Sequence, residues 1–338
     1  MMLRPMLNLS LMTVLTATAL VACGDDKGTS ATDAASTTAG TEPATTNPTA
    51  SSTDEPTGGT GSGTDEPTTT TPTTSTDPTM GGETAADGEA CTANADCASQ
   101  GCLKYRDLEA GECVAAPAGG NTRIAGTLVD FAAQMPVPNA ELRVIGALSA
   151  LSDPANAPPV IMATADASGQ VDVVSATAIS EGIGIVGIIT GGDYYTTATG
   201  LASPTAGVYG PMNGNHDIWA VPSAKLTEWS GYLVADADLA TSLPLGDKGG
   251  VVGFVRDGQG APKAGAVVVS IKGASSTAKI RYLAADGLSF TGDATSASGI
   301  FVLVAPGLAE KFKVEGGTVE GTAGSAEKAV FVMILTEP

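Results

Sequence analysis

Four cysteines in a short segment are the residues of this chain whose spacing points most directly to chemistry. Cys91, Cys97, Cys102 and Cys113 follow the pattern C-x5-C-x4-C-x10-C. Such a set can form two disulfides or bind zinc, but zinc sites usually contain C-x2-4-C pairs, and only one gap here comes near that spacing. In an exported chain an even number of cysteines favours two disulfides. Three pairings are open, and the spacing does not choose among them.

The first residues of the chain predict export. Residues 1–6 include Arg4, and residues 7–20 are mostly apolar. This apolar run fits a signal peptide and is shorter than the ~20 residues that a membrane-spanning helix needs. Residues 20–23 read Leu-Val-Ala-Cys, and a polar stretch begins at Gly24.

The run of residues 20–23 resembles the lipobox of bacterial lipoproteins, in which small residues precede a cysteine that is lipidated before cleavage on its N-terminal side. The resemblance implies a signal peptide of residues 1–22, lipidation of Cys23, with palmitate among the acyl chains, and a membrane as the partner of that anchor. The alternative is an ordinary signal peptide with an incidental cysteine. Two or three acyl chains anchor a protein stably, whereas one is marginal. Gly24, where an Asp would favour inner-membrane retention, indicates the outer membrane or cell surface within the cell envelope.

Residues 23–90 are predicted to be a disordered linker that follows the lipidated cysteine. Nearly all of residues 24–90 are Thr, Ser, Pro, Gly, Ala or acidic residues, and the sequence Asp-Glu-Pro-Thr occurs at residues 54–57 and again at 65–68. Twelve acidic residues and one base, Lys27, give this stretch −11 of the chain's net charge of −20. Such a composition buries too little apolar surface to offset the entropy of ordering. As a coil it would span roughly 45 Å, and fully extended about 200 Å.

Composition and motifs exclude several functions. With 36 acidic and 16 basic residues among 338, the chain lacks the basic surface that nucleic-acid binding requires. It has one histidine and contains no G-x-S-x-G elbow, H-E-x-x-H motif, phosphate-binding loop or dinucleotide fingerprint. We therefore expect neither catalysis nor a cofactor nor a metal.

The remainder of the chain contains a tandem repeat. Residues 124–130 (Ile-Ala-Gly-Thr-Leu-Val-Asp) align with residues 251–257 (Val-Val-Gly-Phe-Val-Arg-Asp), and Gly169-x-Val171 aligns with Gly299-x-Phe301. Short apolar runs separated by turn residues predict an all-β fold, with two tandem antiparallel sandwiches after the linker and a four-cysteine module at residues 91–114. The sandwiches are predicted at residues 121–222 and 248–338.

A helical connector is predicted between the sandwiches, at residues 223–247. Ser223 is a candidate N-cap, and Leu226, Trp229 and Leu233 would share one helix face.

The second copy resembles a known family. The residues that carry the likeness are Val251-x-Gly253, Asp257, Gly260-x-Pro262-x-x-Gly265-Ala266-x-Val268 and Ser298-Gly299-x-Phe301. This pattern resembles the carboxypeptidase regulatory-like domain, a transthyretin-like, or prealbumin-like, sandwich. The resemblance implies a structural or interaction role, in adhesion or assembly, without catalytic residues. The first copy departs from the pattern, with Asn139 in place of Gly265 and Val171 in place of Phe301.

A carbohydrate-binding surface module is the alternative function, because related sandwich folds bind glycans. The candidate ligand loop for this function holds the densest mixture of rings and hydrogen-bonding groups in the chain. The expected partner is a protein or a glycan at the cell surface. The candidate residues are Tyr194, Tyr195, Tyr209, Asn213, Asn215, His216, Asp217 and Trp219.

The predicted anchor can be tested by replacing Cys23→Ser. Without the thiol there is no acylation, so we expect the variant to leave the membrane fraction. Fractionation after salt and carbonate washes measures this. A variant that stays with the membranes would show that the lipobox interpretation is wrong.

Overall fold

The computed structural model describes residues 84–106, 108–271 and 279–337, and for residues 214–216 it describes the backbone alone. The predicted signal peptide, Cys23 and nearly all of the segment 23–90 lie outside the described residues, so the anchor and the linker stay predictions. No helix in the described part of the chain is long and apolar enough to cross a membrane.

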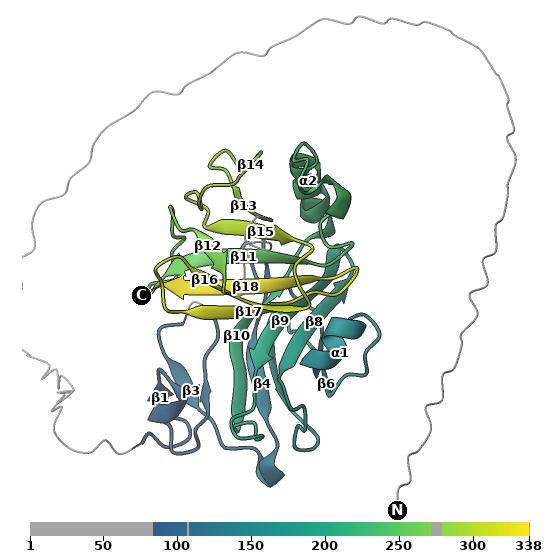
Figure 1. Ribbon diagram of the computed structural model, residues 1–338. Helices are drawn as coiled ribbons and strands as arrows, with labels where there is room; N and C mark the ends of the chain where they lie inside the picture. The colour runs from purple at the N-terminus through teal and green to yellow at the C-terminus, as the bar shows by residue number, and fades with distance from the viewer. Residues whose placement is uncertain (1–83, 107, 272–278, 338) are drawn as a thin grey trace, which may run out of the picture. The chain divides into compact units, whose positions relative to one another are not determined.

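The described chain is mostly β-structure, as predicted (Figure 1). The cysteine module contributes β1 (Ala90–Cys91), η1 (Asn94–Asp96), β2 (Cys102–Leu103), β3 (Gly111–Cys113) and η2 (Ala118–Gly120). The first half continues with β4 (Arg123–Asp130), β5 (Glu141–Gly146), α1 (Ala147–Ser152), β6 (Ile161–Thr164), β7 (Gln170–Val174), β8 (Ile185–Gly191), β9 (Tyr194–Ala202) and β10 (Met212–Ala220). The second half comprises α2 (Ser223–Leu233), η3 (Ala240–Ser242), β11 (Gly250–Asp257), β12 (Val268–Ser270), β13 (Ile280–Leu283), β14 (Phe290–Thr291), β15 (Ile300–Val304), β16 (Ala309–Val314), β17 (Glu320–Gly324) and β18 (Val330–Glu337).

A nine-stranded sheet runs through both predicted sandwiches (Figure 1). Its order is β14-β13-β15-β11-β18-β9-β8-β5-β6, so five strands of the second half continue into four of the first. The joint is a short parallel pairing in which Val330, Phe331 and Val332 of β18 lie opposite residues 197–199 of β9. Three smaller sheets accompany it, with the orders β1-β3-β2, β10-β4-β7 and β12-β16-β17.

Two of the smaller sheets cover opposite faces of the nine-stranded sheet. Successive side chains of a strand point to opposite faces. Val144 of β5 packs in a cluster with Ile124 of β4, whereas its neighbour Ile145 packs in another cluster with Phe312 of β16. Sheet β10-β4-β7 therefore forms the first sandwich on one face, and sheet β12-β16-β17 forms the second on the other.

The last strand, β18, is apolar over most of its length and has buried residues on both faces. Phe331 and Met333 pack in the core of the second sandwich, together with residues of β5, β8 and β9. Val330 and Val332 pack on the opposite face, in a cluster that contains Trp229 of α2. β18 is thus in contact with both sandwiches and with the connector.

The predicted helix is present as α2, and its apolar face is buried at Leu226, Trp229 and Leu233. Its predicted cap is wrong. Pro222 occupies the N-cap position, no side chain caps the helix, and Ser223 is the first helical residue. The ring of Trp229 meets Phe131 and Phe290 edge-on, at centroid distances of 6.3 and 6.2 Å. Packing, more than capping, therefore fixes this helix.

The tandem repeat is visible in the strand pairing. Gly126 of β4 lies opposite Val171 of β7, and Gly253 of β11 lies opposite Phe301 of β15. The first strand of each copy also pairs in parallel with the last, β4 with β10 and β11 with β18. These parallel pairs are a difference from the antiparallel sandwiches expected, because apolar rhythm carries no information about strand direction.

The two copies of the repeat share a backbone conformation at one position where their residues differ. Gly265 has φ 75° and Asn139 has φ 56°, so both occupy the left-handed region. Asn tolerates that region better than most residues with a side chain. The substitution therefore keeps the turn before the second strand of each sandwich.

Gly253→Ala tests the close packing of the second sandwich. A Cβ at this position would overlap the ring of Phe301, which is almost fully buried. We expect a loss of about 1–3 kcal/mol in the free energy of unfolding. Because the two sandwiches share one sheet, urea unfolding should remain a single transition.

Gly231→Ala is the matched control, since its Cβ would meet open space on α2. This variant should be unchanged or up to about 1 kcal/mol more stable. Separate transitions for the two halves in either variant would contradict the shared sheet.

Candidate functional site

The four cysteines form two disulfides, as predicted. Cys91 bonds to Cys102 and Cys97 bonds to Cys113, the one of the three pairings that interleaves the two links. All four cysteines are buried and make the core of the module. Each link closes a loop and contributes about 2–4 kcal/mol to a segment that has few other core residues.

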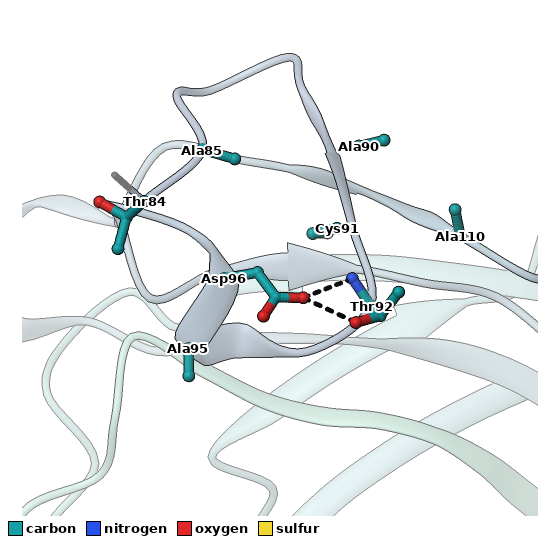
Figure 2. A pocket seen from close by; sticks show the side chains of 8 residues that line it. All are labelled: Thr84, Ala85, Ala90, Cys91, Thr92, Ala95, Asp96 and Ala110. Atoms are coloured by element: carbon teal, nitrogen blue, oxygen red, sulfur yellow. Dashed lines mark hydrogen bonds between the residues drawn. The ribbon is translucent and has the colours of Figure 1, made fainter. Parts of the chain in front are cut away.

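A hollow of about 470 Å³ lies on the cysteine module (Figure 2). Half of its eight lining residues are alanine, and its one charged group is Asp96. The Asp96 carboxylate accepts hydrogen bonds from the amide and hydroxyl of Thr92 and from the amide of Ala93, at 2.7–2.9 Å. The Thr92 hydroxyl, followed by these amides, lowers the pKa of Asp96. Asp96 therefore closes a turn, and this hollow has little chemistry to offer a ligand.

Arg106 follows β2 of the cysteine module and attaches this module to the first sandwich. Its Nη1 donates to Asp217 Oδ2 at 2.7 Å, and its Nη2 donates to Gln134 Oε1 at 3.1 Å. The guanidinium also lies 5.5 Å from the centroid of the Trp219 ring. Both partners of the ion pair are about one-fifth exposed, so the pair is screened less than a surface pair.

The predicted ligand loop is largely a pair of strands. Tyr194 and Tyr195 begin β9, whereas Asn213, Asp217 and Trp219 belong to β10. The position of each residue along its strand decides where its side chain points, because successive residues of a strand alternate between the two faces of the sheet.

The four rings do not gather on one surface. Tyr194 packs against the core of the first sandwich and donates a hydrogen bond to Asp130, while Tyr195 packs in the cluster around α2. Tyr209 is 6% exposed and donates to the carbonyl of Glu181, and Trp219 is 3% exposed. Burial, then the charges of Asp247 and Glu181 respectively, raise the pKa of Tyr195 and of Tyr209. None of these four rings is an open platform for a sugar.

The polar candidates are divided as well. Asn213 donates to the carbonyl of Gly210 within its own turn, and Asp217 pairs with Arg106. For Asn215 and His216 the structure gives the backbone only, with His216 opposite Gly126 in the parallel ladder. The structure brings Asp217 and Trp219 together at Arg106, and it separates them from Tyr209 and Asn213.

The best candidate site is a groove of about 760 Å³ where Lys104, Tyr105, Arg106 and Leu108 meet both sandwiches. Its described walls come from β9, β10, β11, β17 and β18, and they include three cations, Lys104, Arg106 and Arg256, against one carboxylate, Asp217. Of the predicted site residues, Asp217 and Trp219 line it. The sequence did not suggest the cations, because they are separated by up to 152 positions and belong to no motif.

Two cations of this groove are held by side chains next to them. Arg106 is held by Asp217, and the Arg256 Nε donates to the Thr336 hydroxyl at 2.9 Å. Elsewhere, the carboxylates of Asp166 and Asp236 accept backbone amides within their own turns.

No protein-family model and no curated protein matches the sequence. Among solved structures, shaft pilin SpaA from Lactobacillus rhamnosus GG gives a TM-score of 0.21 at 8% identity over 64% of this chain and 98% of that chain. A streptococcal ancillary pilin gives 0.19 at 11% identity over 64% and 68%. The Bacillus anthracis TIE protein also gives 0.19 at 11% identity, over 64% of this chain and 34% of its own, so this chain spans about a third of its length. TM-scores this low do not establish a shared fold.

The Arg106–Asp217 pair should be coupled measurably. In a double-mutant cycle of Arg106→Ala and Asp217→Ala, we expect a coupling of about 1 kcal/mol or more in unfolding free energy, because the pair is partly buried. The exposed Lys311–Glu320 pair, at 54% and 45% side-chain exposure, is the control and should give less. Equal coupling in the two cycles would contradict the attachment role.

Tyr194 should make stability depend on pH in the alkaline range. Burial, followed by the charge and hydrogen bond of Asp130, raises the pKa of Tyr194 to about 12. An unfolded tyrosine loses its proton near pH 10, so the native state holds the proton longer and stability falls between about pH 10 and 12. Below about pH 10 both the native and the unfolded state keep the proton, so this group adds no pH dependence to the stability.

Ultraviolet titration of the phenol groups measures this directly. The wild-type chain should show one tyrosine that ionises near pH 12, and Tyr194→Phe should lack it and show a smaller alkaline loss of stability. Identical titration curves would contradict the assignment.

Proposed function

We propose that the chain is a cell-envelope lipoprotein that displays two β-sandwiches on a flexible stalk and has a structural or interaction role, in adhesion or assembly, without catalysis. The observation that carries this proposal is the nine-stranded sheet shared by both sandwiches. A single body built on one sheet is suited to present a surface at a fixed geometry. The lipobox resemblance at Cys23 and the acidic composition of residues 24–90 add the anchor and the stalk.

The second sandwich is proposed to be a carboxypeptidase regulatory-like domain. The contacts of its motif residues support this proposal. Gly253 accommodates the Phe301 ring, and Gly299, at φ 68°, lies against the carbonyl of Val255. Asp257 accepts the amides of Gln259 and Ala261 and so closes the turn before Pro262.

No observation favours the carbohydrate-binding alternative. Stacking on a sugar requires exposed rings on one face, whereas Tyr194, Tyr195, Tyr209 and Trp219 are divided among separate clusters and at least partly buried.

Protease treatment of intact cells tests the display role. If the lipoprotein is anchored on the cell surface, external protease should remove residues 84–337 from the membrane fraction of intact cells, while a periplasmic marker protein survives. The Cys23→Ser chain serves as the control for material that is not anchored. Complete protection in intact cells, with digestion only after lysis, would contradict surface display.

A further inference from the structure

The second edge of β18 is open over its last residues. β18 pairs with β9 only through Val332, while it continues along β11 as far as Glu337. Beyond Val332, no strand among the described residues pairs with this edge. Residues 333–336 read Met-Ile-Leu-Thr, without the proline or the charge that usually protects such an edge. An apolar edge of this kind pairs readily with a strand of another molecule.

The cysteine module stands beside this edge. Tyr105 and Arg106 follow β2 of the module and line the groove. The same groove is lined by Met333, Ile334 and Thr336 of β18. To extend a sheet, a strand must lie about 4.8 Å from its neighbour. A second folded molecule would therefore have to bring a whole sheet that close to β18, and the docked module obstructs this approach.

Arg106 holds the module in this position. Its backbone amide donates to the Thr127 hydroxyl at 3.3 Å, and its guanidinium donates to Asp217 and Gln134. The guanidinium also lies 5.5 Å from the centroid of the Trp219 ring. The module itself is closed by its two disulfides, so it can leave the sandwich as one unit without losing its own fold.

We infer that the cysteine module is a guard for the open edge of β18, docked through Arg106, and that undocking allows β18 of a second copy of this chain to pair with the edge. A second copy fits because an antiparallel pairing of one edge with itself, around a two-fold axis, is self-complementary. Residues 333–336 carry no charge, so identical strands meet there without opposing like charges. This self-pairing does not depend on the proposed anchor or display role.

Arg106→Ala tests the guard on the full-length protein. We expect the module to undock, so that the dimer fraction rises at least about tenfold over that of the wild type. Sedimentation velocity in a density-matched non-ionic detergent measures this fraction. Asp217→Ala removes the same ion pair from the side of the sandwich and should also raise the dimer fraction.

Arg281→Ala is the matched control. Arg281 forms a 2.6 Å ion pair with Asp236, is about as buried as Arg106, and lies on β13, away from the open edge. This variant loses a comparable contact and should stay as monomeric as the wild type. Unfolding midpoints of all variants verify that each is folded.

Acrylamide quenching of tryptophan fluorescence measures undocking separately from association. Trp219 is 3% exposed while the module is docked, and the guanidinium of Arg106 lies over its ring. Quenching should therefore increase in Arg106→Ala and remain at the wild-type level in Arg281→Ala.

A second substitution locates the pairing on β18. Ile334→Lys places a charge on the open edge, and the flexible stem of lysine lets this charge reach the solvent of the groove. In the Arg106→Ala background it should return the dimer fraction to the wild-type value, while quenching remains high. Leu288→Lys, at a position that is 64% exposed and outside the groove, should leave the dimer in place.

The inference is wrong if Arg106→Ala stays monomeric, if its tryptophan quenching does not change, or if its dimer survives Ile334→Lys. Equal association of Arg106→Ala and Arg281→Ala would attribute the dimer to lost stability and would also overturn the guard role.

Discussion

The parallel contact between β18 and β9 is the interaction on which the rest of the structure depends. Three residues of each strand join two sheets that would otherwise be separate, and both faces of β18 are then buried by different partners. A strand that is apolar on both faces must be an inner strand. This constraint places the first sandwich, the second sandwich and α2 around the same element.

The small sheets lie on opposite faces of the common sheet. Alternate side chains of one strand therefore belong to two different cores. In β8, Ile188 belongs to the core of the second sandwich and its neighbour Ile189 to the core of the first. Burying both side chains of such pairs contributes roughly 1.5–3 kcal/mol each by hydrophobic transfer. The near-continuous apolar sequences of β8 and β18 follow from this, since neither strand has a face in water along its whole length.

Much of the fold was predictable from the sequence because its signals are local. The disulfides, the sandwich repeat, the buried face of α2 and the two apolar faces of residues 330–335 all follow from spacing and periodicity. The joint between the sandwiches was not predictable in detail, because the pairing of Val330 with Thr197 joins residues 133 positions apart with no local signature. The parallel pairing of β4 and β10 could not be predicted for the same reason.

The candidate site was predicted only at Asp217 and Trp219. Ring density suggested a ligand loop, but a run of residues rich in tyrosine is equally suited to strands whose rings pack inward, as Tyr194 and Tyr209 do. The groove depends on Lys104 and Arg256, which come together only where the residues that follow β2 of the cysteine module reach the junction.

The interleaved disulfides have a mechanical consequence. Tension applied to the chain ahead of Cys91 can pass along the backbone to Cys97 and then through the Cys97–Cys113 disulfide. This path from Cys91 to Cys113 crosses 6 residues, whereas the backbone alone crosses 22. At about 3.5 Å per residue, the covalent length is limited to a fraction of the roughly 77 Å that the reduced segment could reach. While both disulfides are present, they limit how far Cys91 and Cys113 can be pulled apart. Reduction would increase this maximum separation several-fold.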